Sequence, residues 1–325
     1  MANIKDVAEK AGVTVTTVSR VLNNRGYISE KTREKVHKAM EELNYQPNEL
    51  ARALLKRKSN LIGLVIPDVS HPFFAELSYF VEYYAYEKGY KILLCNASRD
   101  STKEKDYIDM LKRNQVVGII MGSHTLETSE YLKVGLPIVA IDRFLSERIP
   151  YISSDNYNGG AAATKLLIDK GCKKLAHISG PLTLNTPANK RYESFVDIAK
   201  ENNIPYVVVE TQLNRFDEEE YKRIIYKLFQ EHPDIDGIFA SSDLIAACAI
   251  AVSNVLGKEI PENIKIVGYD DTAIASLIVP ALSTIRQPIE KIGEMAVEII
   301  LDELNGKEVN KTNILPIELV ERGTT

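Results

Sequence analysis

The chain has 325 residues, of which 45% are hydrophobic, and its formal net charge at pH 7 is −5. This length and unbiased composition allow full hydrophobic cores and predict more than one domain. The sequence opens with no signal-peptide pattern and holds no apolar run of about eighteen residues, so we expect a cytoplasmic protein with no membrane partner.

Residues 4 to 23 predict two short helices joined by a turn. Apolar side chains at helical spacing mark the first helix: Ile4, Val7, Ala8 and Ala11. Gly12 suits the left-handed residue that ends a helix, and the Thr14 hydroxyl can cap the next one. An inward stripe marks the second helix: Val18, Val21 and Leu22. The spacing predicts a helix-turn-helix, although an ordinary helical hairpin also fits these residues alone.

The second helix leaves small polar side chains and one arginine facing outward. Such a surface lets the backbone approach base edges closely, while the Arg20 guanidinium can bridge guanine O6 and N7. We therefore expect double-stranded DNA to contact the following residues of this motif: Thr14, Val15, Thr16, Thr17, Ser19, Arg20 and Asn23.

A third helix and a fourth amphipathic segment complete this N-terminal part. Ser29 can cap the third helix, whose apolar positions are Val36, Ala39, Met40 and Leu43. Asn48 can cap the fourth segment, which ends in a Lys/Arg run. Residues 1 to 60 hold 12 Lys and Arg against 7 Asp and Glu, so they carry +5 while the remainder carries −10. A basic head on an acidic body favours phosphate binding.

The first 58 residues resemble the headpiece of the LacI-GalR family of DNA-binding regulators. The stretches IKDVAEKAGV, TVSRVLN, TREKV and YQPNELARALL carry the resemblance in this order and without gaps. It implies a hinge helix over residues 48–56 that folds on specific DNA, with Leu54 as a wedge in the minor groove and Ala51 near its mate across a dimer axis. Leu54 has a simpler alternative, which is packing against Leu50 or Leu61.

From residue 61 onward, short β-rich apolar runs alternate with helix-length amphipathic segments. The predicted strands of the first series are 61–66, 90–95, 117–121 and 138–141, and those of the second are 175–179, 206–209, 237–240 and 264–268. Such alternation predicts parallel sheets with right-handed crossovers, in an α/β fold. Two series of similar length favour two lobes over a single large doubly wound domain.

This body resembles the two-lobed type I periplasmic-binding-protein fold that the family carries behind its headpiece. The resemblance implies a headpiece over 1–58 and a ligand-binding and dimerisation body over 59–325. We expect the chain to cross between lobes near Tyr157, near Gln287 to Pro288 and near Asn310. Lobe one would then span about 61–157 plus 289–309, and lobe two about 158–287 plus 310–325.

Polar and aromatic residues at the carboxyl ends of the predicted strands are the candidates for a small-molecule site. By position they match the family's sugar-contacting residues, and the expected set is Phe73, Phe74, Asp142, Arg143, Arg191, Ser242, Asp270 and Gln287. Aromatic faces can stack on the C–H side of a sugar, and charged groups can bind its hydroxyls. His71 and Ser242 depart from the family pattern, because relatives often have asparagine at these two positions.

Several of these positions have ordinary structural alternatives. Phe73 or Phe74 alone could belong to the core, and Asp243 could be a helix N-cap as readily as a ligand contact. Asp155 and Asn156 could equally cap a helix that starts near Asn158.

Neither a metal nor a cofactor is expected. The histidines His37, His124, His177 and His232 show no metal-ligand spacing. The cysteines Cys95, Cys172 and Cys248 lie in apolar stretches without CxxC spacing, which favours reduced packing residues.

The sequence therefore predicts a transcriptional repressor that acts as a homodimer on a pseudo-palindromic operator, with a small carbohydrate in each body altering DNA affinity. A corepressor-dependent or phosphoprotein-dependent regulator of the same family is the alternative. A secreted solute-binding protein would lack the basic head. An enzyme is not expected, because no Gly-rich phosphate loop, GxSxG elbow or paired nucleophile and base is present in the sequence.

Overall fold

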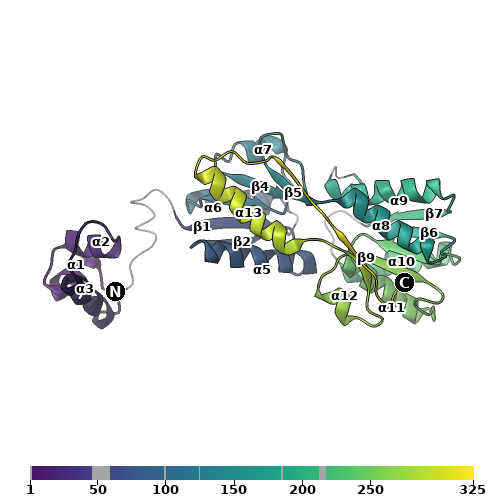
Figure 1. The fold of residues 1–325 in the computed structure, drawn as a ribbon, viewed down its shortest axis with the longest axis horizontal. Coiled ribbons are helices and arrows are strands. Elements are labelled where there is room, and N and C mark those ends of the chain that lie inside the picture. The colour runs from purple at the N-terminus through teal and green to yellow at the C-terminus, as the bar shows by residue number, and fades with distance from the viewer. Residues whose placement is uncertain (1, 46–58, 99, 124, 184–185, 212–216) are drawn as a thin grey trace. The chain divides into compact units, whose positions relative to one another are not determined.

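The computed structural model describes residues 2–45, 59–98, 100–123, 125–183, 186–211 and 217–325. The chain divides into two compact units, a head of residues 1–59 and a body of residues 60–325 (Figure 1). The predicted hinge helix over 48–56, with Ala51 and Leu54, lies outside the described residues, as does His124.

The head is a bundle of three helices, α1 (Ile4–Ala11), α2 (Val15–Leu22) and α3 (Glu30–Glu42). Gly12 ends α1 at φ 66°, a left-handed conformation that a side chain disfavours. The Thr14 side chain caps α2 by accepting from the Thr17 backbone N–H at 3.1 Å. The small apolar core of the head consists of Val7, Ala8, Ala11, Val18, Val21, Val36 and Ala39. The predicted helix-turn-helix is therefore confirmed. Ser29 precedes α3 as predicted, but its side chain makes no cap bond to the backbone.

The first lobe of the body is built on a parallel sheet of order β11-β5-β4-β3-β1-β2. Its strands are β1 (Leu61–Ile66), β2 (Lys91–Asn96), β3 (Gly118–Met121), β4 (Ile138–Ile141), β5 (Tyr151–Ser154) and β11 (Thr312–Leu315). The helices α5 (Pro72–Glu87) and α13 (Ile289–Leu304) pack together over one face. The helices α6 (Ser101–Arg113) and α7 (Thr128–Leu132) supply the other apolar layer.

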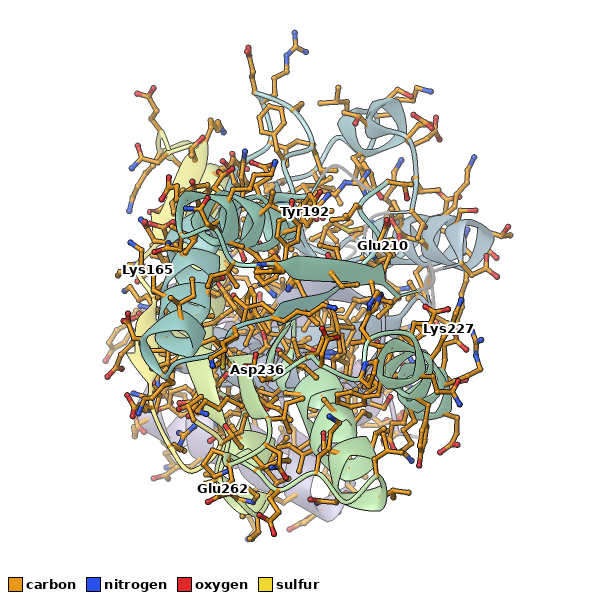
Figure 2. The ribbon with its side chains drawn as sticks, turned by 90° about the vertical axis from the view of Figure 1, so that its right-hand side faces the viewer. Lys165, Tyr192, Glu210, Lys227, Asp236 and Glu262 are labelled. Atoms are coloured by element: carbon orange, nitrogen blue, oxygen red, sulfur yellow. The ribbon has the colours of Figure 1, made fainter. Side chains whose placement is uncertain are left out.

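The second lobe repeats this design with the order β12-β10-β9-β8-β6-β7, and β12 alone runs antiparallel to its neighbour. Its strands are β6 (Leu175–Ser179), β7 (Tyr206–Glu210), β8 (Gly237–Ala240), β9 (Lys265–Asp270), β10 (Ser283–Arg286) and β12 (Glu318–Val320). Its helices are α8 (Asn156–Asp169), α9 (Lys190–Glu201), α10 (Glu218–Glu231), α11 (Asp243–Val255) and α12 (Ala273–Leu277), with the short turn η1 (Pro187–Asn189). Figure 2 shows α8 and α9, marked by Lys165 and Tyr192, on one side of the sheet and α10, marked by Lys227, on the other.

The chain passes between the lobes at three places. The first lies between β5 and α8, and the second follows β10, after which α13 returns to the first lobe. The third comes after Leu315 and not near Asn310, because β11 pairs with β5 before β12 joins the second sheet. This late crossing corrects the predicted lobe boundary at 309–310 and extends lobe one through Leu315.

Clusters of buried apolar side chains form the cores of both lobes. The described residues contain no cluster of His, Cys, Asp or Glu side chains that could hold a metal ion. In that same part of the chain no helix combines the length and apolarity needed to span a membrane.

His177 is a fully buried side chain in the core of the second lobe. Its Nδ1 lies 2.9 Å from the Phe239 carbonyl oxygen, and its ring stacks on Phe239 and Phe195 with centroids at 4.7 and 5.1 Å. Burial lowers the pKa of His177 from 6.5 to about 3. The unfolded chain therefore takes up a proton that the folded protein does not, so stability falls as the pH drops from about 6.5 toward 3.

We predict that His177→Gln, which can keep a donor for the Phe239 carbonyl but does not titrate, reduces acid sensitivity. The loss of unfolding free energy between pH 7.5 and pH 5 should be smaller by about 2 kcal/mol than in the parent chain. Chemical denaturation at both pH values measures it. The control is His37→Gln, at an exposed position of the head, and an unchanged pH dependence in His177→Gln contradicts the prediction.

Candidate functional site

The first candidate site is the outward surface of α2 in the head. Thr14, Val15, Thr16 and Arg20 are exposed, whereas Thr17, Ser19 and Asn23 are half-buried. Val15 exposes 39% of its surface although it is apolar. An apolar side chain at the start of a reading helix is suited to contact a thymine methyl group.

Two local contacts fix the polar side chains on this surface. The hydroxyl groups of Thr14 and Thr17 lie 2.9 Å apart at the start of α2. At its end, the Asn23 amide donates to the Ser19 carbonyl oxygen at 2.8 Å. Thr14, Thr17, Ser19 and Asn23 are therefore positioned by the helix ends, while Thr16 and Arg20 project from the middle.

Tyr27 is an exposed aromatic that the sequence analysis missed. It lies between α2 and α3 and exposes 98% of its surface. A tyrosine hydroxyl is a common donor to DNA phosphates. The sequence signal that could have identified Tyr27 is its position in an Arg-Gly-Tyr turn shortly after the second helix.

The second candidate site is a cavity of about 230 Å³ between the lobes of the body. It lies where loops follow the carboxyl ends of parallel strands, the usual place for ligands in open α/β sheets. The predicted residues that line it are Phe73, Phe74, Asp142, Arg191, Ser242, Asp270 and Gln287. His71, Ser179, Thr211 and Tyr221 line it as well. Arg143 is half-buried in the loop after β4 and is not part of the lining.

Arg191, near the start of α9, is a buried cation with partners from both lobes. Its Nε donates to the Asn156 side-chain oxygen at 2.6 Å, and its Nη1 donates to the Ser241 carbonyl at 2.8 Å. Its Nη2 lies 3.8 Å from Oδ2 of Asp142, which follows β4 of the first lobe. The guanidinium also lies over the Tyr269 ring, 3.6 Å from the centroid. Burial removes the water that would hydrate the guanidinium, and these hydrogen bonds, the carboxylate and the ring replace that hydration.

Asp142 directly follows β4 and has a left-handed backbone conformation, with φ 54°. Its Oδ1 accepts from the Ser153 hydroxyl at 2.6 Å and from the Asn156 amide at 3.1 Å. Backbone strain of this kind persists only where neighbours fix it. Asn156 therefore links Asp142 of one lobe to Arg191 of the other.

A second chain of contacts runs through the crossing after β10. The Gln287 amide donates to Oδ1 of Asp270 at 2.7 Å, and its side-chain oxygen accepts from the Ser154 hydroxyl at 2.7 Å. Asp270 has φ 119°, which is again unusual for a residue with a side chain. The carboxyl ends of β5, β9 and β10 are thus tied together at the cavity.

Burial raises the pKa of Asp270 well above its ordinary value, and the nearby Asp243 carboxylate raises it further. Burial likewise raises the pKa of Asp243 to about 7, although hydrogen bonds from Thr284 and Thr272 oppose this. An acid group that is costly to ionise benefits from any ligand hydroxyl that donates to it.

Asp243 is neither a helix N-cap nor a residue of the cavity lining, the two roles that the sequence suggested for it. Ser242 is the N-cap of α11 and accepts from the Ile245 N–H at 3.3 Å. Asp243 is the first helical residue and does not line the cavity. Its Oδ1 accepts from the Thr284 hydroxyl at 2.6 Å and its Oδ2 from the Thr272 N–H at 2.7 Å, so it holds the loop after β9 to β10.

Asp155 is the N-cap of α8, since its side chain accepts from the Asn158 N–H at 3.1 Å. Asn156 is instead buried between Asp142 and Arg191. The sequence analysis missed this role because an Asn beside an Asp at a helix start is indistinguishable from a cap. Tyr269 and Ser154 were also missed, since buried strand residues give no signal of a site.

Family comparisons match the two units separately. Residues 3–48 match the family described as bacterial regulatory proteins, lacI family. Residues 164–325 match a periplasmic binding protein-like domain.

Two curated repressors are similar along essentially the whole chain. The ribose operon repressor of Halalkalibacterium halodurans is 41% identical over 326 residues, which cover 100% of this chain and 97% of that protein. The sucrose operon repressor of Streptococcus mutans is 41% identical over 320 residues, which cover 98% of each chain.

Solved structures show the same architecture. The lac repressor dimer bound to operator and the anti-inducer ONPF superposes with a TM-score of 0.88 at 27% identity, over 99% of this chain and 98% of that one. A periplasmic binding protein/LacI transcriptional regulator from Alkaliphilus metalliredigens, complexed with D-xylulofuranose, gives a TM-score of 0.75 at 34% identity, over 82% of this chain and 99% of that one.

Gly160 of α8 sets the position of Arg191. A Cβ at this glycine would come within 2.6 Å of the Arg191 carbonyl oxygen and would also strike the Ser194 hydroxyl. The backbones of α8 and α9 can approach this closely only because no side chain intervenes.

We predict that Gly160→Ala lowers the free energy of unfolding by about 1 to 3 kcal/mol through overpacking. Gly180→Ala is the matched control, because a Cβ there meets no atom within 4 Å. Chemical denaturation of both variants measures the effect. Equal stability of the two would show that α8 and α9 can separate without cost.

Proposed function

This chain belongs to the LacI family of bacterial regulatory proteins and is a DNA-binding transcriptional regulator, and from that premise we propose that it represses a carbohydrate-utilisation operon. A small sugar bound between the lobes of the body lowers its affinity for the operator. Relatives that are similar along its whole length are named as repressors of ribose and sucrose operons.

The observation that carries this proposal is the lining of the cavity. Seven side chains expected at a sugar site, from segments far apart in the sequence, line one cavity of about 230 Å³. Two aromatic rings, Phe73 and Phe74, meet edge to face with centroids 5.1 Å apart on its first-lobe side. Carboxylates and a guanidinium complete it, which is a combination suited to a polyhydroxylated ring.

Sugar binding alters operator affinity by changing the arrangement of the two lobes. The cavity draws residues from both, so a ligand that contacts both changes their relative energy. Such coupling between two sites is typically about 1 to 3 kcal/mol. We place the protein in the cytoplasm, where its operator DNA lies.

We propose that the repressor acts as a homodimer. Large apolar side chains of the body are exposed on α5, at the end of α11 and beside α12: Tyr79, Tyr83, Tyr86, Val255, Leu277 and Val279. These three helices lie along the lower edge of the body in Figure 1. An extended apolar surface of this kind is typical of an interface, and a two-fold axis would present two heads to a pseudo-palindromic operator.

Arg20→Ala should weaken specific operator binding by about 1 to 3 kcal/mol, because it removes the one long basic donor of α2. Base preference at one position of each half-site should relax as well. Binding titrations on operator variants at fixed salt measure both effects. Lys5→Ala, at an exposed site outside α2, is the control for lost charge, and unchanged selectivity in Arg20→Ala would remove Arg20 from the reading surface.

Arg191→Met should abolish the response of operator binding to sugar, because the cavity loses its charged donor. Operator binding without sugar should persist, since the head is a separate unit with its own core. Gel-shift titrations with and without sugar measure both properties. Lys190→Met changes the adjacent exposed residue and serves as the control. A variant that is still released from its operator by sugar would refute the role of this cavity.

A further inference from the structure

The chain is strained at two consecutive residues where β9 ends. Asp270, the last residue of β9, has φ 119°, and Asp271 has φ 57°. A side chain disfavours both backbone conformations, whereas glycine adopts them readily. Strain of this kind persists where neighbouring groups determine it. The groups that hold these two residues therefore also decide how the Asp270 carboxyl faces the cavity between the lobes, which is the proposed effector site.

Asp270 and Asp271 have different surroundings. Asp270 lines the effector cavity together with Gln287, whose backbone N–H donates to the Asp270 carbonyl oxygen at 3.1 Å. Asp271 is not part of that lining. It borders a separate hollow with Arg286 and with residues of α5 and α13. Its side chain is only 5% exposed, so its carboxylate requires compensation from neighbouring groups.

Two arginines bind the Asp271 carboxylate, one at each oxygen. The Arg286 Nε donates to Oδ2 at 2.7 Å, and the Arg322 Nη2 lies 2.7 Å from Oδ1. Arg286 is the last residue of β10 and pairs with Asp270 in the β9–β10 ladder, while Arg322 follows β12. Hydrogen bonds between charged groups are stronger than those between neutral ones. We call these three residues, Arg286, Asp271 and Arg322, the Asp271 clamp.

Both arginines of the clamp are held by neighbouring strands. The Arg286 Nη1 donates to Glu318 Oε2 at 2.6 Å, at the start of β12. The Arg322 Nη1 donates to the Leu282 carbonyl oxygen at 2.8 Å, and its backbone N–H donates to the Ser283 hydroxyl at 2.8 Å. The clamp therefore ties the strained backbone at the end of β9 to β10 and β12 of the second lobe.

We infer that Arg286 and Arg322 are positioning residues of the effector site, because they hold Asp271 in its left-handed conformation and thereby keep Asp270 turned toward the cavity. Neither arginine lines the cavity. Their contribution to sugar recognition is indirect and depends on the backbone of residues 270–271. The inference rests on the proposed function, since it assigns two further residues to the same site.

Two substitutions of Asp271 separate the backbone from the charge. Asp271→Ala and Asp271→Gly both remove the carboxylate that the arginines bind, and they differ only in the Cβ that strains a left-handed residue. Asp271→Ala should weaken sugar binding about tenfold, since nothing then offsets the strain. Asp271→Gly should bind about fivefold or more tightly than Asp271→Ala, because glycine keeps the conformation without the clamp.

Substitutions of the arginines test the other half of the clamp. Arg286→Met and Arg322→Met together should weaken sugar binding about tenfold, and adding Asp271→Gly to them should restore most of the affinity. A loss of general stability would not be rescued in this way. Arg223→Met is the matched control and should bind sugar as the parent does. Arg223 bonds the nearly buried Glu220 carboxylate, but both residues lie in the regular helix α10, where no positive φ has to be held.

The measurements use the full chain. Thermal shift selects the probe from D-ribose, D-glucose, sucrose and cellobiose, and calorimetry with that sugar gives the affinities. Crystal structures of the two Asp271 variants without sugar form a second arm that needs no ligand. Residue 271 should leave the left-handed region in Asp271→Ala, with loss of the 2.7 Å bond from Gln287 to Asp270, and should keep both features in Asp271→Gly.

The outcomes distinguish the inference from the proposed function. Equal sugar affinity of Asp271→Ala and Asp271→Gly overturns the inference, and so does an Asp271→Ala structure in which residue 271 and the Gln287 contact are unchanged. A sugar-sensing repressor survives both results. A parent chain that binds none of the probes, and whose operator binding no sugar alters, refutes the proposed function instead. The crystal structures then still decide whether the clamp holds Asp270.

Discussion

The buried guanidinium of Arg191 is the interaction on which the body depends. Removing an arginine from water costs several kcal/mol unless partners replace its hydration. Here the partners come from both lobes: Asp142 from the first, Ser241 and Tyr269 from the second, and Asn156 at the crossing between them. The relative position of the lobes is therefore tied to the compensation of one charge, and a ligand that reaches this charge can shift the balance between lobe arrangements.

Strain and close packing are concentrated at the same place. Asp142 and Asp270 both have positive φ values, at the ends of β4 and β9, and α8 meets α9 at a glycine. Conformations of this kind cost about 1 to 3 kcal/mol each and persist where surrounding contacts determine them. Ser153 and Asn156 donate hydrogen bonds to Asp142, and Gln287 donates one to Asp270. The unfavourable backbone conformations therefore lie where the carboxylates of Asp142 and Asp270 line the same cavity.

Sequence patterns predicted what is local or strongly apolar. The head follows from caps and helical spacing, and β1, β4, β6 and β8 follow from continuous apolar runs. The strands β5, β10, β11 and β12 escaped prediction because they are short and carry polar or exposed side chains, as in Tyr151–Ser154. The strand-end rule found most of the cavity, yet it placed Arg143 there, since adjacent residues at a strand end leave in different directions. Asn156 depends on contacts between lobes, which no local pattern records.

The energy that a small ligand must supply is modest. A change of operator affinity by about 5- to 150-fold corresponds to 1 to 3 kcal/mol of coupling. A single hydrogen bond contributes about 0.5 to 1.5 kcal/mol net, and bonds to charged groups contribute more. Asp270 and Arg191 belong to the second lobe and Asp142 to the first, so a ring that bonds to all three gains two or more bonds only when both lobes surround it. A ligand that bonds to side chains of both lobes would therefore supply coupling of this size with only two or three hydrogen bonds.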